Sequence, residues 1–453
     1  MKKLFLFTVL LLISFFNGNN AQEAQKQQIL FLNVKIFDGK SDKLITGKDV
    51  LVEGNRIIKI APKIKTNRLV KIVNGQGKVL MPGLIDAHTH LMVTKPFDEA
   101  IYTYEPTYIA SLATEAARRM LMRGFTTARD AGGPVMGLKR AIDEGIVPGP
   151  RIFPSNAFIS QTGGHGDFDL SMTYLSPYFA GQLDKAYLFG WTITADGVPE
   201  VRKAVREVLR SGASQIKIMA SGSITGAHDP LDVVEYAPEE MRAIVEEAEK
   251  WGTYAMAHAY SDEAVRTAIE AGVKSIEHGL MASPETLKLM KKKGVWLSTQ
   301  CLNYSKNVED FGVEMPANVA AKFNEAKKSA ERVYKLAKKY GLKLAWGTDT
   351  FGSLEVQDTE SQEFTARSKY FSNIEILRQV TSLNGELLSL SGKRSPYPDG
   401  RLGVVEEGAY ADLLIVDGNP LQDITLLAKP EESIQFIMKD GTIYKNTFNP
   451  KKD

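Results

Sequence analysis

Residues 81–91 read MPGLIDAHTHL, in which a Pro-Gly pair precedes a short apolar run that ends in two histidines. Pro82-Gly83 interrupts the preceding segment, and the run after it predicts a buried strand. Side chains two positions apart on a strand share a face, so His88 and His90 are expected side by side at its end. Two adjacent imidazoles form half of a divalent-metal site. The alternative is two half-exposed histidines at the edge of a surface strand.

The surrounding region, residues 81–395, alternates apolar runs with helical stretches, which is typical of a parallel α/β fold. Helices are expected at 238–251 and 262–271. Strands are expected at 84–89, 125–129, 152–160, 215–220, 253–259, 275–278, 295–300 and 342–348. Eight strands separated by helices predict a (β/α)8 TIM barrel with its functional site at the carboxyl ends of the strands. The insert 163–199 is expected to be a loop at that site.

Both ends of the chain carry short strand-like segments with the turn residues of hairpins. These turns are expected at Asp38-Gly39, Gly54-Asn55, Asp417-Gly418 and Asp440-Gly441. The two sets of strands predict one small β-sandwich domain built from both termini, with residues 22–80 as its N-terminal part and 396–453 as its C-terminal part.

Residues 1–21 have the pattern of a cleavable signal peptide: Lys2-Lys3, an apolar run, and a polar segment that ends in Ala21. The apolar run is short for a membrane-spanning helix, which argues against the alternative of a membrane anchor. We therefore expect a periplasmic or secreted protein without a stable membrane anchor.

The composition narrows the function classes further. The formal net charge is +2, and Lys2 and Lys3 supply both charges, so the mature chain would be near neutral. A neutral chain argues against a nucleic-acid binder. Cys301 is the only cysteine, so no intramolecular disulfide can form, and we expect a packed thiol rather than a nucleophile.

Further candidate ligands fall at the ends of the predicted strands. His258 ends the run TYAMAHA, His278 ends KSIEHG, and Asp349 closes LKLAWGTD. These positions are where the functional residues of a barrel belong. Lys217 lies inside the apolar run QIKIMA, where an unpaired charge would be costly. The alternative for Lys217 is a lysine in a salt bridge, or one whose amine reaches the surface.

The phrase MPGLIDAHTHL resembles the first-strand signature of the amidohydrolase superfamily. The resemblance implies two divalent metal ions, one held by His88, His90 and Asp349 and the other by His258 and His278. It also implies that Lys217, at the fourth strand, is carboxylated and bridges the ions. Zinc suits these ligands best, with Mn, Fe or Co also open. A metal-bridging hydroxide would be the nucleophile, and Asp349 would be the general base and then the general acid.

A second segment, QTGGHGDF at residues 161–168, resembles the imidazolonepropionase-like and metal-dependent Xaa-Pro or Xaa-Arg dipeptidase branch. By this resemblance His165 would polarise the scissile carbonyl. The alternative is a loop histidine hydrogen-bonded to Asp167. His228 and Tyr260 are candidate substrate contacts, although Tyr260 could equally be a packing residue. Gly222-Ser223 stands where related sequences often have two glycines, which leaves details of the pocket open.

These features predict an exported binuclear hydrolase of amide C–N bonds, a dipeptidase or N-acyl-amino-acid amidase that acts on small molecules. One alternative is an imidazolonepropionase-like cyclic amide hydrolase, against which Lys217 argues because those enzymes use one metal. Another is a non-catalytic metal- or solute-binding barrel, which would need neither a bridging lysine nor Asp349. The sequence leaves homo-oligomer formation open.

Overall fold

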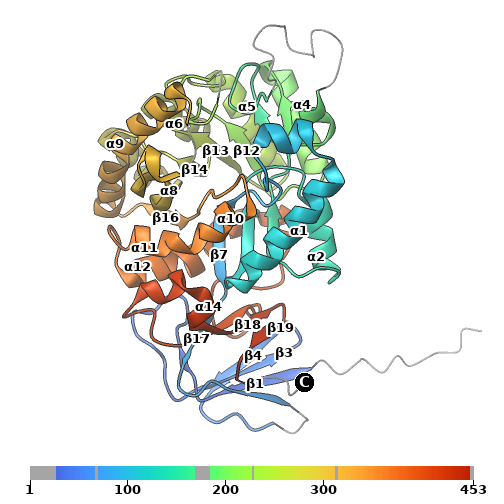
Figure 1. The fold of residues 1–453 in the computed structure, drawn as a ribbon, viewed down its shortest axis with the longest axis vertical. Coiled ribbons are helices and arrows are strands. Elements are labelled where there is room, and N and C mark those ends of the chain that lie inside the picture. The colour runs from blue at the N-terminus through green and yellow to red at the C-terminus, as the bar shows by residue number, and fades with distance from the viewer. Residues whose placement is uncertain (1–26, 67–69, 169–183, 227–228, 312–314, 449–453) are drawn as a thin grey trace, which may run out of the picture.

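The fold has two parts, a barrel and a smaller β-structure at one end of it (Figure 1). The computed structural model describes residues 27–66, 70–168, 184–226, 229–311 and 315–448. The signal-peptide pattern at residues 1–21 and the candidate contact His228 lie outside these ranges. Within them, no helix combines the length and the hydrophobicity needed to cross a bilayer.

The barrel consists of parallel strands in the positions that the sequence predicts. In order they are β7 (Leu84–Thr89), β8 (Phe125–Asp130), β9 (Arg151–Pro154) continued by β10 (Phe158–Ser160), β12 (Ile216–Met219), β13 (Ala255–Ala259), β14 (Ser275–His278), β15 (Trp296–Thr299) and β16 (Lys343–Trp346). Asn384 closes the ring, because its side-chain amide donates to the carbonyls of Ile85 and Trp346, on β7 and β16, at 2.7 Å each. The predicted TIM barrel is confirmed.

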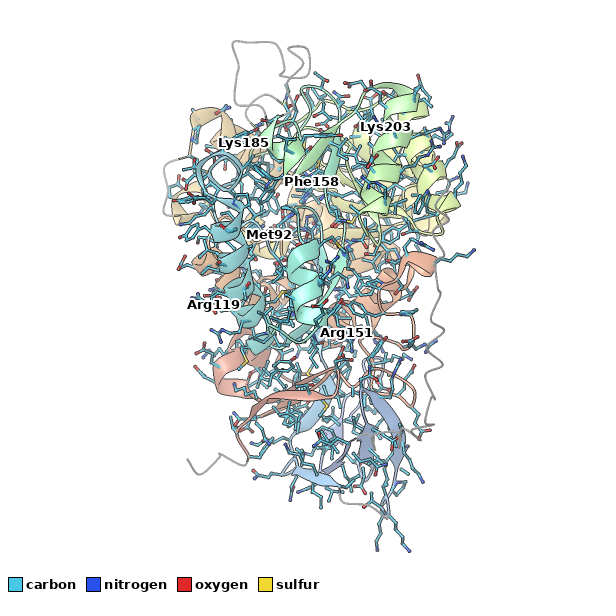
Figure 2. All side chains as sticks on the ribbon, turned by 90° about the vertical axis from the view of Figure 1, so that its right-hand side faces the viewer. Met92, Arg119, Arg151, Phe158, Lys185 and Lys203 are labelled. Atoms are coloured by element: carbon cyan, nitrogen blue, oxygen red, sulfur yellow. The ribbon has the colours of Figure 1, made fainter. Side chains whose placement is uncertain are left out.

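The third strand was predicted as one continuous run over 152–160, but in the structure it consists of two pieces. It breaks after Pro154, and Asn156 takes a left-handed φ of 56° before β10 begins. The two pieces divide the pairing, since β9 pairs with β8 whereas β10 pairs with β12 and with an unpredicted strand, β11 (Thr192–Thr194). In Figure 2, Arg151 lies toward the β-structure and Phe158 lies higher in the barrel.

Helices surround the barrel. The longer ones are α1 (Pro106–Met122), α2 (Met136–Asp143), α4 (Gly197–Arg210), α5 (Pro238–Lys250), α6 (Asp262–Ala271), α7 (Pro284–Lys293) and α9 (Ala317–Tyr340). The shorter ones are α3 (Lys185–Leu188), α8 (Cys301–Ser305), α10 (Leu354–Gln357), α11 (Glu363–Arg367), α12 (Asn373–Arg378) and α13 (Asn384–Ser389). Helix α4 shows why they pack on the strands: Val201, Ala204, Val205 and Val208 form one buried stripe at helical spacing. The two helices expected from the sequence are α5 and α6.

The smaller part is a pair of facing sheets. One contains β4 (Arg56–Ala61), β3 (Asp49–Glu53), β1 (Gln28–Leu32) and β5 (Lys71–Asn74); the other contains β19 (Thr442–Asn446), β18 (Ile434–Lys439), β17 (Leu413–Val416), β6 (Val79–Pro82) and β2 (Lys35–Ile36). Phe31 and Phe436 meet edge to face between the sheets, with ring centroids 5.4 Å apart. Both termini therefore share one hydrophobic core.

Two details of the sheets differ from simple hairpins. Asp417-Gly418 does not close a tight turn, because the short helix α14 (Pro430–Ser433) lies between β17 and β18. The second sheet also mixes the termini, since β6 pairs with β17. Strand β6 leads through Gly83 directly into β7, so the stretch MPGLIDAHTHL links the sandwich to the barrel.

Buried charge joins the two parts. Arg151, at the start of β9, donates to Asp412 at 2.8 Å and to Asp440 at 2.5 Å. Burial opposes the charge on Arg151, but the two carboxylates outweigh it and raise its pKa. Removing one partner of such a buried pair leaves an uncompensated charge, so this contact fixes how the barrel sits on the sandwich.

Candidate metal centre

Three potential ligands converge where the barrel closes between β16 and β7. His88 lies on β7 and His90 just beyond it, and their ring centroids are 5.4 Å apart. Asp349 follows β16, and its Oδ1 lies 3.5 Å from His88 Nε2 and 3.4 Å from His90 Nε2. The backbone N–H of Asp349 donates to the carbonyl of His88 at 2.8 Å, so the closure of the barrel brings the aspartate to the histidines. We call these three residues the first half-site.

Each histidine of the first half-site has a hydrogen-bond partner on its far nitrogen. Nδ1 of His88 donates to Glu277 at 2.8 Å, and Nδ1 of His90 donates to the carbonyl of Gly132 at 3.0 Å. These partners assign the proton to Nδ1 and leave Nε2 as the free nitrogen facing Asp349. Glu277 is itself held by Arg129 at 2.8 Å.

The protonation states suit a metal site. Burial, and then the charge of Lys217, lower the pKa of His88 to about 3, so its imidazole is neutral at physiological pH. Burial would raise the pKa of Asp349, but the neighbouring histidines outweigh it and hold that pKa below the ordinary range. A neutral imidazole and an ionised carboxylate are the forms that bind divalent cations.

The second half-site consists of Lys217, His258 and His278, on β12, β13 and β14. The rings of His258 and His278 lie 4.6 Å apart, and His278 lies 5.2 Å from His88, so the half-sites adjoin. Burial lowers the pKa of His278 to about 4, and burial also holds the pKa of His258 well below its usual range. Nδ1 of His278 donates to Gln300 at 2.8 Å. His258 Nε2, in contrast, is buried and has no hydrogen-bond partner among the described residues.

Lys217 is almost completely enclosed, with 2% of its surface exposed. Burial lowers the pKa of its amine to about 8, although Glu277 and Asp349 act in the opposite direction. A substantial fraction of the amine is therefore neutral, and thus nucleophilic, near physiological pH. The surface-reaching alternative is excluded by this burial, whereas the chemical state of the amine stays a prediction.

The backbone at the site is strained at two of the candidate ligands. His278 has φ of 73° and Asp349 has φ of 54°, both in the left-handed region that non-glycine residues rarely occupy. Such conformations cost about 1–3 kcal/mol each and cluster at functional sites. Gly347 allows the chain after β16 to pass close to β7, because a Cβ at Gly347 would lie only 2.8 Å from the Cβ of His88.

The glycine-rich segment places His165 at the second half-site. Its ring stacks on His258 with centroids 4.6 Å apart and planes 25° apart. Nδ1 of His165 lies 3.1 Å from Asp229 Oδ2. Asp167, the partner that the sequence offered as an alternative, instead accepts from the backbone N–H of Gly163 at 2.9 Å. The structure therefore pairs His165 with Asp229.

Tyr260 also lies at the second half-site. Its ring stacks on His278 with centroids 4.8 Å apart, and its hydroxyl lies 2.7 Å from that of Tyr304. Ser221 is buried beneath, where its Oγ accepts from the backbone N–H of Tyr260 at 2.9 Å. The role of Tyr260 toward a substrate stays a prediction.

The six candidate ligands line a cavity of about 310 Å³, together with His165 and Tyr260. One wall, beside His90, is aromatic and contains Phe97, Phe158, Phe168 and Phe351. The lining also contains Tyr260, Asn303, Tyr304, Met315, Val319 and Phe323. A mainly apolar cavity with a few convergent polar groups is the usual form of a small-molecule site.

A second cleft, of about 1070 Å³, lies at the junction of barrel and sandwich. Its walls include Lys40, Tyr397, Arg401 and Glu406. Lys40 and Arg401 pair with Glu406 at 2.7 and 2.8 Å, so the charges there are used in exposed structural contacts. The cavity at the strand ends is the better candidate for chemistry.

Several supporting residues were not predicted from the sequence. Glu277 stands beside His278 in a buried strand, a position that could have drawn attention to it. Asp86 accepts from the backbone N–H of His88 at 2.8 Å and from the hydroxyl of Thr348 at 2.6 Å, which ties β7 to the turn that carries Asp349. Asp229 gave no local signal, because only the folded loop brings it to His165.

The donor set fits divalent cations. The described residues contain a compact group formed by His88, His90 and Asp349, whose ligand atoms lie within 4.8 Å of one another. The unpartnered Nε2 of His258 is a buried polar atom that would otherwise cost free energy, and a cation at the second half-site would satisfy it. Imidazole and carboxylate ligands suit zinc and also other first-row metals.

Known proteins resemble this chain over most of its length. A model described as "Amidohydrolase family" matches residues 79–447. Ochratoxinase of Aspergillus niger is 33% identical over 382 residues, which cover 81% of this chain and 76% of that protein. The crystal structure of a prolidase complexed with N-methylphosphonate-L-proline has 33% identity and a TM-score of 0.85, covering 93% of this chain and 100% of that one. The crystal structure of a Xaa-Pro dipeptidase with bound methionine in the active site has 27% identity and a TM-score of 0.79, with the same coverage.

Proposed function

We propose, from the premise that this chain belongs to the amidohydrolase family, that it is an exported, binuclear metal-dependent dipeptidase or N-acyl-amino-acid amidase. The family confirms the resemblance read from MPGLIDAHTHL, and the chain is a hydrolase that acts on carbon–nitrogen bonds. The number of ions, the substrate and the export are the proposed parts.

The convergence of six donors at the strand ends carries the proposal. His88, His90 and Asp349 would hold one ion, and His258 and His278 the other. Lys217 would bridge them as a carbamate: its neutral amine adds to CO2, an N–C bond forms, and one proton is released. Burial supports this reaction because it lowers the pKa of the amine to about 8.

Divalent cations bound there would lower the pKa of water and polarise the scissile carbonyl. Asp349 is the ionised carboxylate next to the imidazole ring nitrogens, so it is placed to accept a proton from water. The same carboxyl can then deliver that proton to the leaving amine. Breaking an amide needs this second transfer, because an amine leaves poorly as an anion.

We assign the contact with the substrate carbonyl to His165. Asp229 lies against its Nδ1, so Nε2 is the nitrogen that remains for a ligand. The stacking of its ring on His258 keeps it beside the second half-site. A positioned polar group at the carbonyl stabilises the charge that develops there during hydrolysis.

The cavity supports a small substrate with an apolar group next to the scissile bond. A volume of about 310 Å³ is at the lower end for small-molecule sites, and aromatic rings form the wall beside His90. Relatives named as a prolidase and a Xaa-Pro dipeptidase agree with a dipeptide. Tyr260 and Ser223 line the cavity and are the described candidates for the substrate carboxylate, with His228 a further one from the sequence.

The test is a screen of the purified mature chain, grown with zinc, against dipeptides and N-acyl amino acids, each paired with its C-terminal amide. We expect about two metal ions per chain and a higher kcat/KM for each acid than for its amide, because a site that pairs a carboxylate discriminates against its neutral analogue. N-terminal sequencing of the exported protein should begin near Gln22.

Contrary outcomes are specific to each part. One ion or none in active, folded protein would refute the binuclear site. Equal kcat/KM for acid and amide would show that the carboxylate is not recognised and would favour a cyclic amide hydrolase. Retention of Met1 in the exported protein would refute the signal peptide.

A further inference from the structure

A buried carboxyl that the proposed chemistry does not use lies behind the glycine-rich loop. Glu235 is fully buried, and its backbone N–H donates to the carbonyl of Ala220 at 2.9 Å, at the end of the Lys217 strand. Its Oε1 accepts from the backbone N–H of His165 at 2.6 Å. The hydroxyl of Ser160 donates to Oε2 at 3.2 Å and accepts from the backbone N–H of Gly166 at 3.0 Å. Two successive amides of the loop therefore depend on the Glu235–Ser160 pair.

The glycines of the loop fit around this carboxyl. A Cβ at Gly164 would lie 2.3 Å from Glu235 Oε2, and a Cβ at Gly166 would lie 2.8 Å from the Cβ of Ser160. Contacts that short do not occur between real side chains, so the loop can approach Glu235 only because both residues are glycines. The glycines of GGHG thus leave the space that the Glu235 carboxyl occupies, although Glu235 lies 70 residues after His165 in the chain.

Glu235 and Asp229 hold different parts of the same residue. Asp229 lies against the ring of His165, whereas Glu235 binds its backbone. Burial, and then the charge of Asp229, raise the pKa of Glu235 to about 8, so at neutral pH it is mainly a neutral carboxyl. Oε1 of the carboxyl accepts from the His165 amide and Oε2 accepts from the Ser160 hydroxyl, so both contacts use acceptor oxygens, which a neutral carboxyl keeps.

We propose that Glu235 is a positioning residue for His165, which holds the loop backbone so that the imidazole stays stacked on His258 over the second half-site. Its predicted effect on catalysis rests on the function proposed above, whereas its predicted effect on the loop does not. Glutamine keeps the contact with the His165 amide through its carbonyl oxygen, and its amide N–H can donate to Ser160 Oγ when the Ser160 hydroxyl hydrogen turns away. Methionine has a similar size and can reproduce neither.

The experiment compares the full mature chain with its Glu235→Gln and Glu235→Met variants. Hydrogen exchange of the peptide spanning residues 161–168 is measured first. We expect Glu235→Met to speed exchange of the His165 amide about tenfold, the equivalent of one hydrogen bond, and Glu235→Gln to change it little. Glu239→Ala, an exposed position in the first turn of α5, is the matched control and should change nothing.

Activity gives the second measurement, as a double-mutant cycle with His165→Ala. Glu235→Met should lower kcat about tenfold or more in the wild-type background and change it little in the His165→Ala background, because its effect passes through His165. Glu235→Gln should restore most of kcat. Equal losses in both backgrounds would overturn the positioning role.

The exchange measurement decides the inference even if the proposed function is wrong. Unchanged exchange at residues 161–168 in folded Glu235→Met would overturn it, whether or not a substrate is found. If Glu235→Met does not fold, Ser160→Ala replaces it: faster exchange of the Gly166 amide supports the Glu235–Ser160 pair, and unchanged exchange overturns it.

Discussion

The two half-sites differ in how completely the polypeptide itself satisfies them. In the first half-site, both histidines have partners on Nδ1, and both Nε2 atoms lie within 3.5 Å of Asp349. In the second, the Nε2 of His258 is buried without a partner among the described residues, and Lys217 is enclosed with a lowered pKa. Both histidines of the first half-site are therefore held by hydrogen bonds of the protein, whereas in the second half-site His278 is held by Gln300 and the Nε2 of His258 has no partner among the described residues.

The difference follows from the place of each half-site in the barrel. The first lies where the last strand closes on the first strand, and Asp86 and Asn384 tie these strands together. The second lies on three consecutive strands, β12 to β14, which bring the side chains together without tying them to one another. In the proposed binuclear site, the first half-site would be the better preorganised of the two for an ion, because hydrogen bonds already orient its histidines.

The largest expected effect comes from removing the proton-transfer group of the first half-site. Asp349→Asn keeps an oxygen ligand but cannot accept a proton from water, so we expect metal to be retained and kcat to fall by about two to four orders of magnitude. Metal analysis and steady-state kinetics measure both. The exposed Glu355→Gln, in the first turn of α10, is the control. Near-normal turnover would show that another group carries the proton.

A smaller loss is expected from breaking the second half-site at Lys217. Lys217→Ala cannot form a carbamate, so we expect loss of one of the two ions and at least a ~tenfold loss of activity. Short-chain carboxylic acids should restore part of the activity by replacing the carbamate. Lys203→Ala, at an exposed position of α4, is the control. Normal activity of Lys217→Ala would remove this residue from the site.

The smallest effect concerns the stability of the metal-free protein, and it tests one histidine of the second half-site. His278 has a folded-state pKa of about 4, below the unfolded value of 6.5, so the unfolded chain binds the extra proton first as the pH falls. Stability from this group is complete above pH 6.5 and is lost toward pH 4, at about 1.4 kcal/mol per pH unit. In His278→Asn, the free energy of unfolding should therefore fall less steeply between pH 6.5 and 4 than in the wild type.

Urea unfolding of chelator-treated wild type and His278→Asn, between pH 7 and 4.5, measures that difference. Taking the difference cancels groups that shift in the opposite direction, such as Asp130, whose pKa burial raises to about 7. Parallel pH profiles for the two proteins would mean that His278 is not a buried neutral imidazole in the metal-free state.

Much of the barrel could be predicted because its signals are local. The apolar runs and their order along the chain gave the strand positions, and strand ends in a barrel share one face. The break at Asn156 escaped this reasoning, because a left-handed residue inside an apolar run leaves no periodicity signal. The pairing of β6 with β17 across the two termini also depends on long-range contacts.

By itself the sequence determined which side chains could form the centre, since His88, His90, Lys217, His258, His278 and Asp349 all occupy predicted strands or their ends. Only the tertiary structure decided which residues form hydrogen bonds or ion pairs with these side chains and with His165. Glu277 reaches His88 from a strand 189 residues away, Asp229 replaces Asp167 beside His165, and Glu235 closes on the glycine loop. The physical reason is one of range. A strand end follows from neighbouring residues, whereas a hydrogen bond between distant segments exists only after the barrel has closed and brought both atoms within about 3 Å.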